Sequence, residues 1–141
     1  KFNKLLKNKI KIFKIETKLA IKNLNKIMSA GNNFLIDRGD LSKDVSIEMI
    51  PIAQREILKM SKLKKKRVYV ATNFLESMIN SKYPTRGETN DIYNTLEMGS
   101  SGIVLAAETA IGKYPKECIS FLENIIKTFR KYGGATKNLY M

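Results

Sequence analysis

The chain alternates short apolar runs with longer segments of helical periodicity, and this alternation is the feature that most limits its possible folds. The apolar runs are predicted as strands at residues 9–16, 34–36, 67–71 and 103–105. A segment with apolar residues at helical spacing follows each run. Parallel strands need long crossover connections, usually helices, so this order favours a parallel sheet covered by helices. The sequence therefore predicts an α/β chain of four consecutive βα units.

The first predicted helix covers residues 18–30. Its apolar stripe consists of Ala20, Leu24, Ile27 and Met28. Gly31 follows the stripe and predicts a left-handed stop, because glycine adopts positive φ at little cost. Three further helices are predicted, at residues 50–63, from Thr85 to about Met98, and from Pro115 to Gly133.

End signals support these later helices. Pro51 suits the first helical turn, where its missing N–H costs nothing. Thr85 and Glu88 have the spacing of a capping box, and Gly99 closes the helix that they begin. The buried stripe of the last helix is predicted to contain Cys118, Leu122, Ile125, Ile126 and Phe129. We expect one domain segment over residues 1–134 and a flexible tail at 135–141.

Two carboxylates stand where predicted strands give way to loops. Glu16 ends the first strand, and Asp40 follows the second. Lys14 lies two residues before Glu16, so both side chains leave the same face of the strand. Strand ends of a parallel α/β sheet meet at one rim, which is where α/β barrels carry out chemistry. The pair of carboxylates predicts a site for a hard divalent cation.

Composition excludes several classes of function. The formal charge of +13 would suit a polyanion partner, but the lysines are scattered and no aromatic platform lies among them, so the pattern disfavours nucleic-acid binding. The single cysteine, Cys118, excludes an intrachain disulfide, and the lack of histidine excludes a histidine-bearing zinc site or a serine triad. No apolar run has the length of a membrane span, and no signal-peptide pattern begins the chain.

Several short motifs occur together in a fixed order. They are Lys14-Ile15-Glu16, Arg38-Gly39-Asp40-Leu41, Ala71-Thr72 with Leu75-Glu76-Ser77-Met78, Pro84-Thr85-Arg86, and Glu108-Thr109-Ala110 with Gly112 and Tyr114-Pro115. In this order and spacing they resemble pyruvate kinase, specifically the later half of its catalytic barrel. The resemblance implies that the four βα units form about half of a TIM-type (β/α)₈ barrel, since a closed barrel needs roughly 250 residues.

The resemblance also implies roles for particular residues. Glu16 and Asp40 would hold Mg²⁺ or Mn²⁺, and Lys14 would stabilise charge on the transferred phosphoryl group. Gly39 and Asp40 would offer backbone N–H groups to the substrate carboxylate. Thr72 would lie near the carbon that is protonated. These roles agree with the chemistry of phosphoryl transfer, which depends on positioning and on neutralising negative charge.

The implied reaction moves phosphate from phosphoenolpyruvate to ADP, giving pyruvate and ATP, in glycolysis. K⁺ would bind through residues outside this chain, and the early barrel strands would supply further ligands. We therefore expect the isolated segment to be inactive and to associate with the missing barrel half or with a second copy. The expected compartment is the cytoplasm, with an organelle not excluded.

Some positions depart from the pattern of the family. Asp37 stands where a small alanine is expected, and it adds a negative charge beside an anionic substrate. Asn73 replaces a glutamine, and Ala106-Ala107 replaces Ser-Gly, which removes a hydroxyl from a proton-delivery path. Tyr93 replaces a small helix residue and implies a new packing partner or an exposed ring.

Simpler interpretations stay open for each motif. Lys14 and Glu16 could be a solvated pair, Arg38-Gly39-Asp40 a turn, and Thr72 a helix cap. For the whole chain, one alternative is a noncatalytic relative that acts in regulation or binding, favoured by Asp37 and Ala106. Another is a metal-dependent pyruvate lyase or aldolase on a related barrel. A basic nucleic-acid binder is the third.

Overall fold

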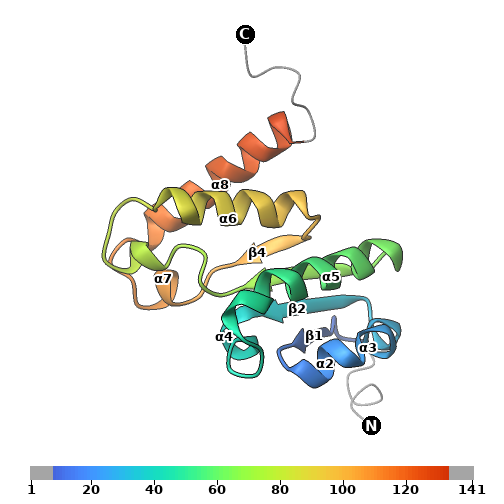
Figure 1. Cartoon of the computed structure of the whole chain (residues 1–141). Helices are drawn as coiled ribbons and strands as arrows, with labels where there is room; N and C mark the ends of the chain where they lie inside the picture. The colour runs from blue at the N-terminus through green and yellow to red at the C-terminus, as the bar shows by residue number, and fades with distance from the viewer. Residues whose placement is uncertain (1–7, 134–141) are drawn as a thin grey trace. The chain divides into compact units, whose positions relative to one another are not determined.

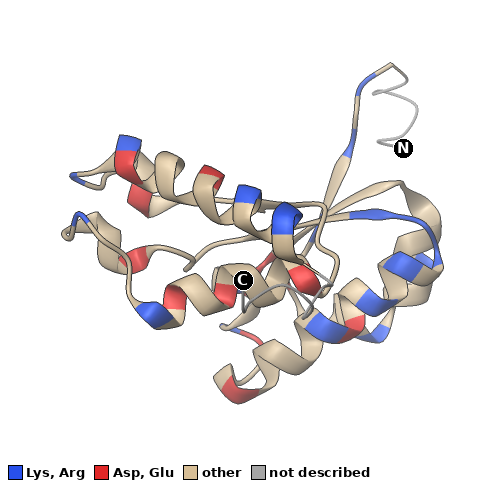
Figure 2. Cartoon of the chain, turned by 90° about the horizontal axis from the view of Figure 1, so that it is seen from above, with Lys and Arg blue, Asp and Glu red and all other residues tan. Residues whose placement is uncertain are grey.

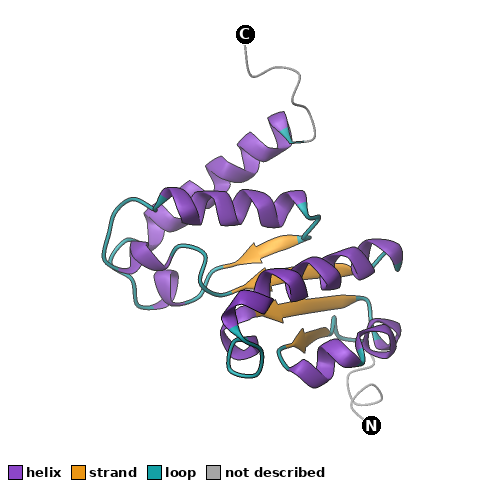
Figure 3. Ribbon diagram, viewed as in Figure 1, coloured by secondary structure: helices purple, strands orange, loops and turns teal. Residues whose placement is uncertain are grey.

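The computed structural model describes residues 8–133, in which strands and helices alternate along the chain (Figure 1, Figure 3). The strands follow one another in one sheet in the order β1-β2-β3-β4, and β1 pairs with β2 in parallel. The predicted α/β class, a parallel sheet with alternating helices, is confirmed. Contacts divide the chain into two units between Tyr69 and Val70, inside β3 (Arg67–Ala71), and each unit is described by itself.

The first unit contains two complete strands and the helices that connect them. Its elements are β1 (Ile12–Ile15), α2 (Lys18–Lys22), α3 (Leu24–Ala30), β2 (Asn33–Asp37), α4 (Arg38–Leu41), the 3₁₀ helix η1 (Ile47–Met49) and α5 (Ile50–Leu63). β3 has the predicted bounds, and so does α5, with Pro51 in its first turn. β2 extends the predicted strand by one residue at each end.

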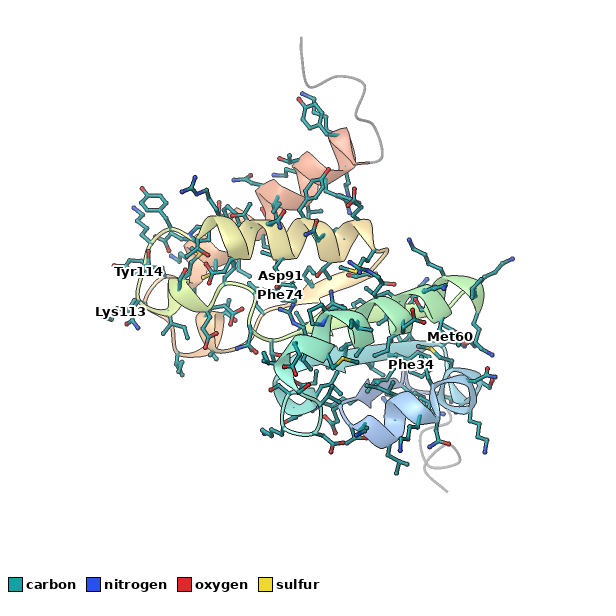
Figure 4. All side chains as sticks on the ribbon, in the orientation of Figure 1. Phe34, Met60, Phe74, Asp91, Lys113 and Tyr114 are labelled. Carbon is teal, nitrogen blue, oxygen red and sulfur yellow. The ribbon has the colours of Figure 1, made fainter. Side chains whose placement is uncertain are left out.

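The core of the first unit forms on one face of its strands. Ile15 on β1 and Phe34 and Ile36 on β2 are fully buried, and Phe34 is labelled in Figure 4. Ile57 and Leu58 on α5 are also fully buried. The alternation of strand side chains explains this arrangement, because every second residue of a strand faces the same side.

The structure corrects the prediction of one helix over residues 18–30. Two helices occupy this range, and Asn23 separates them with φ −102° and ψ 16°. The Asn23 side chain donates a hydrogen bond to the Leu19 carbonyl at 3.0 Å. Asparagine competes for backbone groups in this way, which interrupts a helix even where the apolar stripe continues. Leu24 and Met28 of the predicted stripe are buried.

The prediction for Gly31 was also wrong. Gly31 has φ −158° and ψ −172°, an extended conformation and not a left-handed stop. A Cβ atom at Gly31 would overlap the ring of Phe13, with the ring atom Cδ2 at 2.7 Å. Close packing of an aromatic ring, and not backbone conformation, therefore favours glycine at this position.

The first predicted strand, residues 9–16, is longer than the strand observed. β1 covers only Ile12–Ile15, over which it pairs with β2. Ile10 is 87% exposed and Ile12 54% exposed, so the even-numbered face of this segment is open to solvent among the described residues. The same face carries Lys14.

The second unit holds the rest of β3 and the last strand. Its elements are the 3₁₀ helix η2 (Glu76–Ile79), α6 (Arg86–Glu97), β4 (Gly102–Val104), α7 (Ala107–Ala110) and α8 (Pro115–Tyr132). β4 is shifted by one residue from the predicted 103–105, and α7 is a short helix in a segment predicted only as the rim after the strand. Phe74, labelled in Figure 4, is fully buried in this unit.

The helix-end signals of the second unit are confirmed. The Thr85 side chain accepts from the Glu88 N–H while the Glu88 carboxylate accepts from the Thr85 N–H, which completes the capping box. Gly99 follows α6 with φ 92°, a conformation that glycine adopts more readily than other residues. In α8 the predicted stripe is buried at Cys118 and Ile125. Gly134 and the predicted tail lie outside the described residues.

Tyr93 has a specific packing partner in this unit. Its ring meets that of Phe129 edge to face, with centroids 5.4 Å apart, which joins α6 to α8. The larger side chain at this position is therefore accommodated by an aromatic contact.

Lysine and arginine are spread over several helices and loops of the described chain (Figure 2). Among residues 8–133, no helix combines the length and the apolar character that a membrane crossing needs.

Two glycines of the second unit offer a matched test of packing. A Cβ atom at Gly112 would overlap the Glu108 backbone, with the carbonyl carbon at 3.0 Å, whereas at Gly87 the nearest atom is Thr85 Oγ1 at 3.8 Å. We expect Gly112→Ala to lower the free energy of unfolding by about 1–3 kcal/mol through overpacking. Gly87→Ala, within α6, should raise it by about 0.5–1 kcal/mol. Urea unfolding of both variants would measure the difference, and equal midpoints would contradict the clash at Gly112.

Candidate active site

Side chains of β1 point alternately to its two faces, and this alternation positions the first residues of the site. Ile15 points into the core, so Lys14 and Glu16 leave the opposite, solvent-facing side. Lys14 Nζ lies 2.7 Å from Glu16 Oε2, which realises the predicted pairing of these two side chains.

The register of β1 on β2 brings a third side chain beside this pair. Lys14 is opposite Leu35 and Ile15 is opposite Ile36, so the next positions along the two strands are Glu16 and Asp37. Side chains at matching positions of neighbouring strands share a face and lie close together. Asp37 therefore enters the site because of strand pairing, two residues after Leu35 on the same face.

The short helix α4 supplies the last carboxylate. Asp37 is its N-cap and accepts from the Asp40 N–H through Oδ1 at 3.3 Å. Leu41 of α4 is fully buried, which anchors this turn to the core. Asp40 is directed by this anchored turn toward Lys14, and Gly39 lies beside it in the same turn.

One ammonium group is surrounded by three carboxylates. Lys14 Nζ lies 2.7 Å from Glu16 Oε2, 3.0 Å from Asp37 Oδ2 and 3.3 Å from Asp40 Oδ2. One oxygen of each carboxylate lies within 4.8 Å of the others. The structure thus brings together Lys14, Glu16 and Asp40, which the sequence singled out, and adds Asp37.

Lys43 was missed as a neighbour of the site. Its Nζ lies 2.7 Å from Asp40 Oδ1, whereas Lys14 Nζ contacts the other oxygen, Oδ2. The signal was available in the spacing of three residues between Asp40 and Lys43, which suits an ion pair across one helical turn.

Mutual charge stabilisation shifts the pKa values of these groups. The hydrogen bonds that the Lys14 ammonium donates to Glu16, then to Asp37 and Asp40, raise the pKa of Lys14 far above its ordinary value. Lys43, and after it Lys14, lower the pKa of Asp40. Asp40 in turn raises the pKa of Lys43. The lysines therefore stay protonated and Asp40 stays ionised around neutral pH.

The donor set fits a hard divalent cation. Magnesium and manganese bind carboxylate oxygens by preference, and three such groups converge here. Glu16 Oε2 is shielded from solvent and lies 2.7 Å from the Lys14 ammonium. A shielded anionic oxygen needs a positive charge beside it, so this oxygen is suited to a cation.

Thr72 belongs to the second unit and is described there alone. It follows β3 with φ 71°, and Asn73 continues with φ 57°. Positive φ is rare for a β-branched residue and marks local strain, while asparagine tolerates it better. The Thr72 N–H donates to the Val104 carbonyl at 3.4 Å, and its hydroxyl donates to the Ala71 carbonyl at 2.6 Å. The Asn73 amide donates to Glu76 at 3.0 Å.

Glu108 is the buried carboxylate of the second unit. It is 2% exposed, and its Oε2 accepts from the Ala106 N–H at 3.1 Å. Its Oε1 is buried without a hydrogen-bond partner. Ala106, beside Glu108, has no side-chain hydroxyl, as the sequence already shows.

Glu88 has a purely structural set of contacts. Its carboxylate accepts from the Ser77 N–H at 2.7 Å and the Ser77 hydroxyl at 2.6 Å, and also from the Thr85 N–H at 2.7 Å. Burial would raise its pKa, but the hydrogen bonds from Ser77 and Thr85 lower it overall. The capping box therefore also fastens η2 to α6.

Comparison with known proteins agrees with this geometry. A family model described as the barrel domain of pyruvate kinase matches residues 3–119. A pyruvate kinase of Thermotoga maritima is 45% identical over 120 residues, which cover 85% of this chain and 26% of that protein. A pyruvate kinase of Thermococcus litoralis is 39% identical over 121 residues, or 86% of this chain and 26% of that protein.

Plant relatives match as well. Plastidial pyruvate kinase 3 of Arabidopsis thaliana is 42% identical over 114 residues, covering 81% of this chain and 20% of that protein. The chain belongs to the pyruvate kinase family, in the part that forms the barrel domain. It spans only 20–26% of the length of these relatives.

The pairing of Asp40 with Lys43 is testable through its pKa. Lys43→Gln should raise the pKa of Asp40 toward its ordinary value, because the largest stabilising contact is lost. A lowered carboxyl pKa stabilises the fold above the ordinary value, and this contribution disappears as the pH falls through the lowered one. NMR titration of side-chain carboxyl carbons in metal-free buffer would measure the shift.

Glu48 provides an internal control in the same titration. Its pKa is lowered by its own backbone N–H and by Ser46, neither of which involves Lys43. We expect the Glu48 pKa to be unchanged in the variant. An unchanged Asp40 pKa would show that the ion pair with Lys43 does not form in solution.

Proposed function

We propose that this chain is the later half of a pyruvate kinase barrel, acting in phosphoryl transfer from phosphoenolpyruvate to ADP. The observation that supports this most directly is the convergence of Lys14, Glu16 and Asp40, within the stretch that matches the family model. The relatives carry the name pyruvate kinase, and the reaction is transferred from that name to this chain as part of the proposal.

Glu16 and Asp40 are the proposed ligands of Mg²⁺ or Mn²⁺. Bound there, the divalent cation supplies positive charge that neutralises phosphate and enolate oxygens. Glu16 offers a shielded oxygen, and Asp40 is kept ionised by its neighbouring lysines. Both features favour a negatively charged ligand set at neutral pH.

Lys14 is the proposed catalytic cation of the chain itself. The surrounding carboxylates raise its pKa, so the ammonium form persists throughout the physiological range. A fixed ammonium can neutralise charge that develops on the transferred phosphoryl group. Its side chain is 44% exposed, so the group is accessible to an entering substrate.

Asp37 obstructs the proposed binding of a substrate carboxylate at the backbone amides of α4. The Asp40 N–H already donates to Asp37 Oδ1 at 3.3 Å. A substrate carboxylate at Gly39 and Asp40 would have to displace Asp37 from this amide. Asp37 is therefore a built-in competitor for the substrate position in this chain.

Thr72 remains the proposed neighbour of the carbon that is protonated. Its strained backbone is of the kind that clusters at functional sites. With alanine at position 106, the serine hydroxyl expected from the family pattern is missing from proton delivery. We therefore expect proton transfer to be slower than in relatives that keep it.

The proposed partners follow from the same family. They are phosphoenolpyruvate or pyruvate, ADP or ATP, K⁺ held by residues outside this chain, and either the missing barrel half or a second copy. The isolated chain is proposed to be inactive. The cytoplasm is the proposed compartment, and the chloroplastic names of plant relatives keep an organelle open.

A second function is favoured by two observations. Asp37 places an extra carboxylate in the site, and Ala106 removes a hydroxyl. Both changes would weaken turnover of an anionic substrate while leaving the fold intact. A noncatalytic pyruvate kinase relative, with a regulatory or binding role, is therefore the alternative.

A chimera would test the main proposal. In the chimera, this chain would replace the matching segment of the Thermotoga maritima enzyme. The rest of that enzyme would then supply the strands and ligands that this chain lacks. We expect Mg²⁺-dependent pyruvate formation in a coupled ADP assay, and none from this chain alone. Glu16→Gln and Asp40→Asn in the chimera should each lower kcat by roughly a hundred- to thousand-fold.

The unmodified Thermotoga enzyme is the control for this assay. A folded chimera without turnover would contradict the main proposal. If Asp37→Ala together with Ala106→Ser restored activity to that chimera, the noncatalytic alternative would be supported. Turnover by this chain alone would refute the need for the missing half.

A further inference from the structure

Asp37 is the carboxylate of the site that the metal assignment does not use. Its side chain is 15% exposed, against 35% for Glu16 and 41% for Asp40. It is therefore the most buried acidic group of the three. A half-buried carboxylate is stabilised by a counter-charge, and the Asp37 Oδ2 atom has one in Lys14 Nζ at 3.0 Å.

The backbone fixes Asp37 in this position. Its strand register sets it beside Glu16, and its Oδ1 is held by the Asp40 N–H. Only Oδ2 remains directed at the cation position, where Lys14 Nζ meets one oxygen from each carboxylate. A positively charged group contacting all three acids shows that this point of the structure can stabilise a cation.

The charges of the cluster also favour a cation at this position. The three carboxylates carry three negative charges, and Lys14 and Lys43 together carry two positive charges. Among these five groups, one negative charge has no matching positive charge. Glu16 Oε2 is also shielded from solvent, and the group that lies 2.7 Å from it is the Lys14 ammonium. Both features favour the entry of a further positive charge.

We propose that Asp37 is a third carboxylate ligand of the divalent cation at this site. The inference rests on the proposed function, since it concerns the metal held by Glu16 and Asp40. Asp37 Oδ2 exchanges its partner, Lys14, for the metal, while Oδ1 stays on the Asp40 N–H. A third anionic ligand strengthens binding of a hard cation, so this chain binds the metal more tightly than a two-carboxylate site would.

Mn²⁺ binding to the metal-free chain tests the inference without any catalytic readout. Free Mn²⁺ would be measured by electron paramagnetic resonance, with affinities checked by calorimetry. We expect Asp37→Asn to weaken Mn²⁺ binding by about 10- to 100-fold. Asparagine is as good an N-cap as aspartate, so this variant keeps α4 while removing the charge. Asp37→Ala removes both the charge and the cap, and should bind at least as weakly.

Glu56→Gln is the matched control. Glu56 is an exposed residue of α5 and changes the net charge equally, so its variant should bind Mn²⁺ as the unchanged chain does. Far-UV circular dichroism of each variant would confirm that it is folded.

The outcomes separate this inference from the proposed function. If Asp37→Asn binds Mn²⁺ like the unchanged chain while Glu16→Gln binds weakly, Asp37 is not a ligand and the metal assignment survives. If the unchanged chain binds no Mn²⁺, the inference is overturned together with that assignment. If binding depends on Asp37 but the chimera forms no pyruvate, the inference holds and the proposed reaction fails.

Discussion

The parallel pairing of β1 with β2 is the constraint on which the site depends. Ile15 opposite Ile36 buries both side chains against the helices. The same register makes Glu16 and Asp37 neighbours on the solvent-facing side, and Lys14 lies on that side two residues before Glu16. A slip of one residue would turn every one of these side chains to the other face. Burial of two isoleucines therefore sets the geometry of three charged groups.

Electrostatic balance then determines what this rim can bind. The lysine ammonium groups satisfy the carboxylates in the metal-free chain and keep Asp40 ionised. The same carboxylates raise the pKa of Lys14. The site therefore favours binding of a cation over binding of an anion, because Asp37 already accepts the hydrogen bond of the Asp40 N–H that an anion would use. The convergence of three carboxylates suits a hard divalent cation, whereas Asp37 on the Asp40 N–H disfavours an anionic ligand there.

Many elements were predictable because their signals are local. Pro51, the capping box of Thr85 and Glu88, and Gly99 mark helix ends through backbone groups only a few residues away, and all three were placed correctly. The break at Asn23 and the extended Gly31 were missed. Asn23 acts through a side-chain hydrogen bond that competes with an otherwise regular apolar stripe. Gly31 depends on the Phe13 ring, which is distant in sequence and adjacent only after folding.

The sequence by itself determined the α/β class and the family, and it singled out Lys14, Glu16 and Asp40 as candidate site residues, because motif order and strand parity are properties of the linear chain. Only the tertiary structure decided that Asp37 contacts Lys14 beside Glu16. Lys43 pairs with Asp40 across three residues of the chain, which is a local relation. Asp37 instead enters through the register between β1 and β2, which depends on which residues are brought opposite one another when the core closes, and that information lies between segments of the chain.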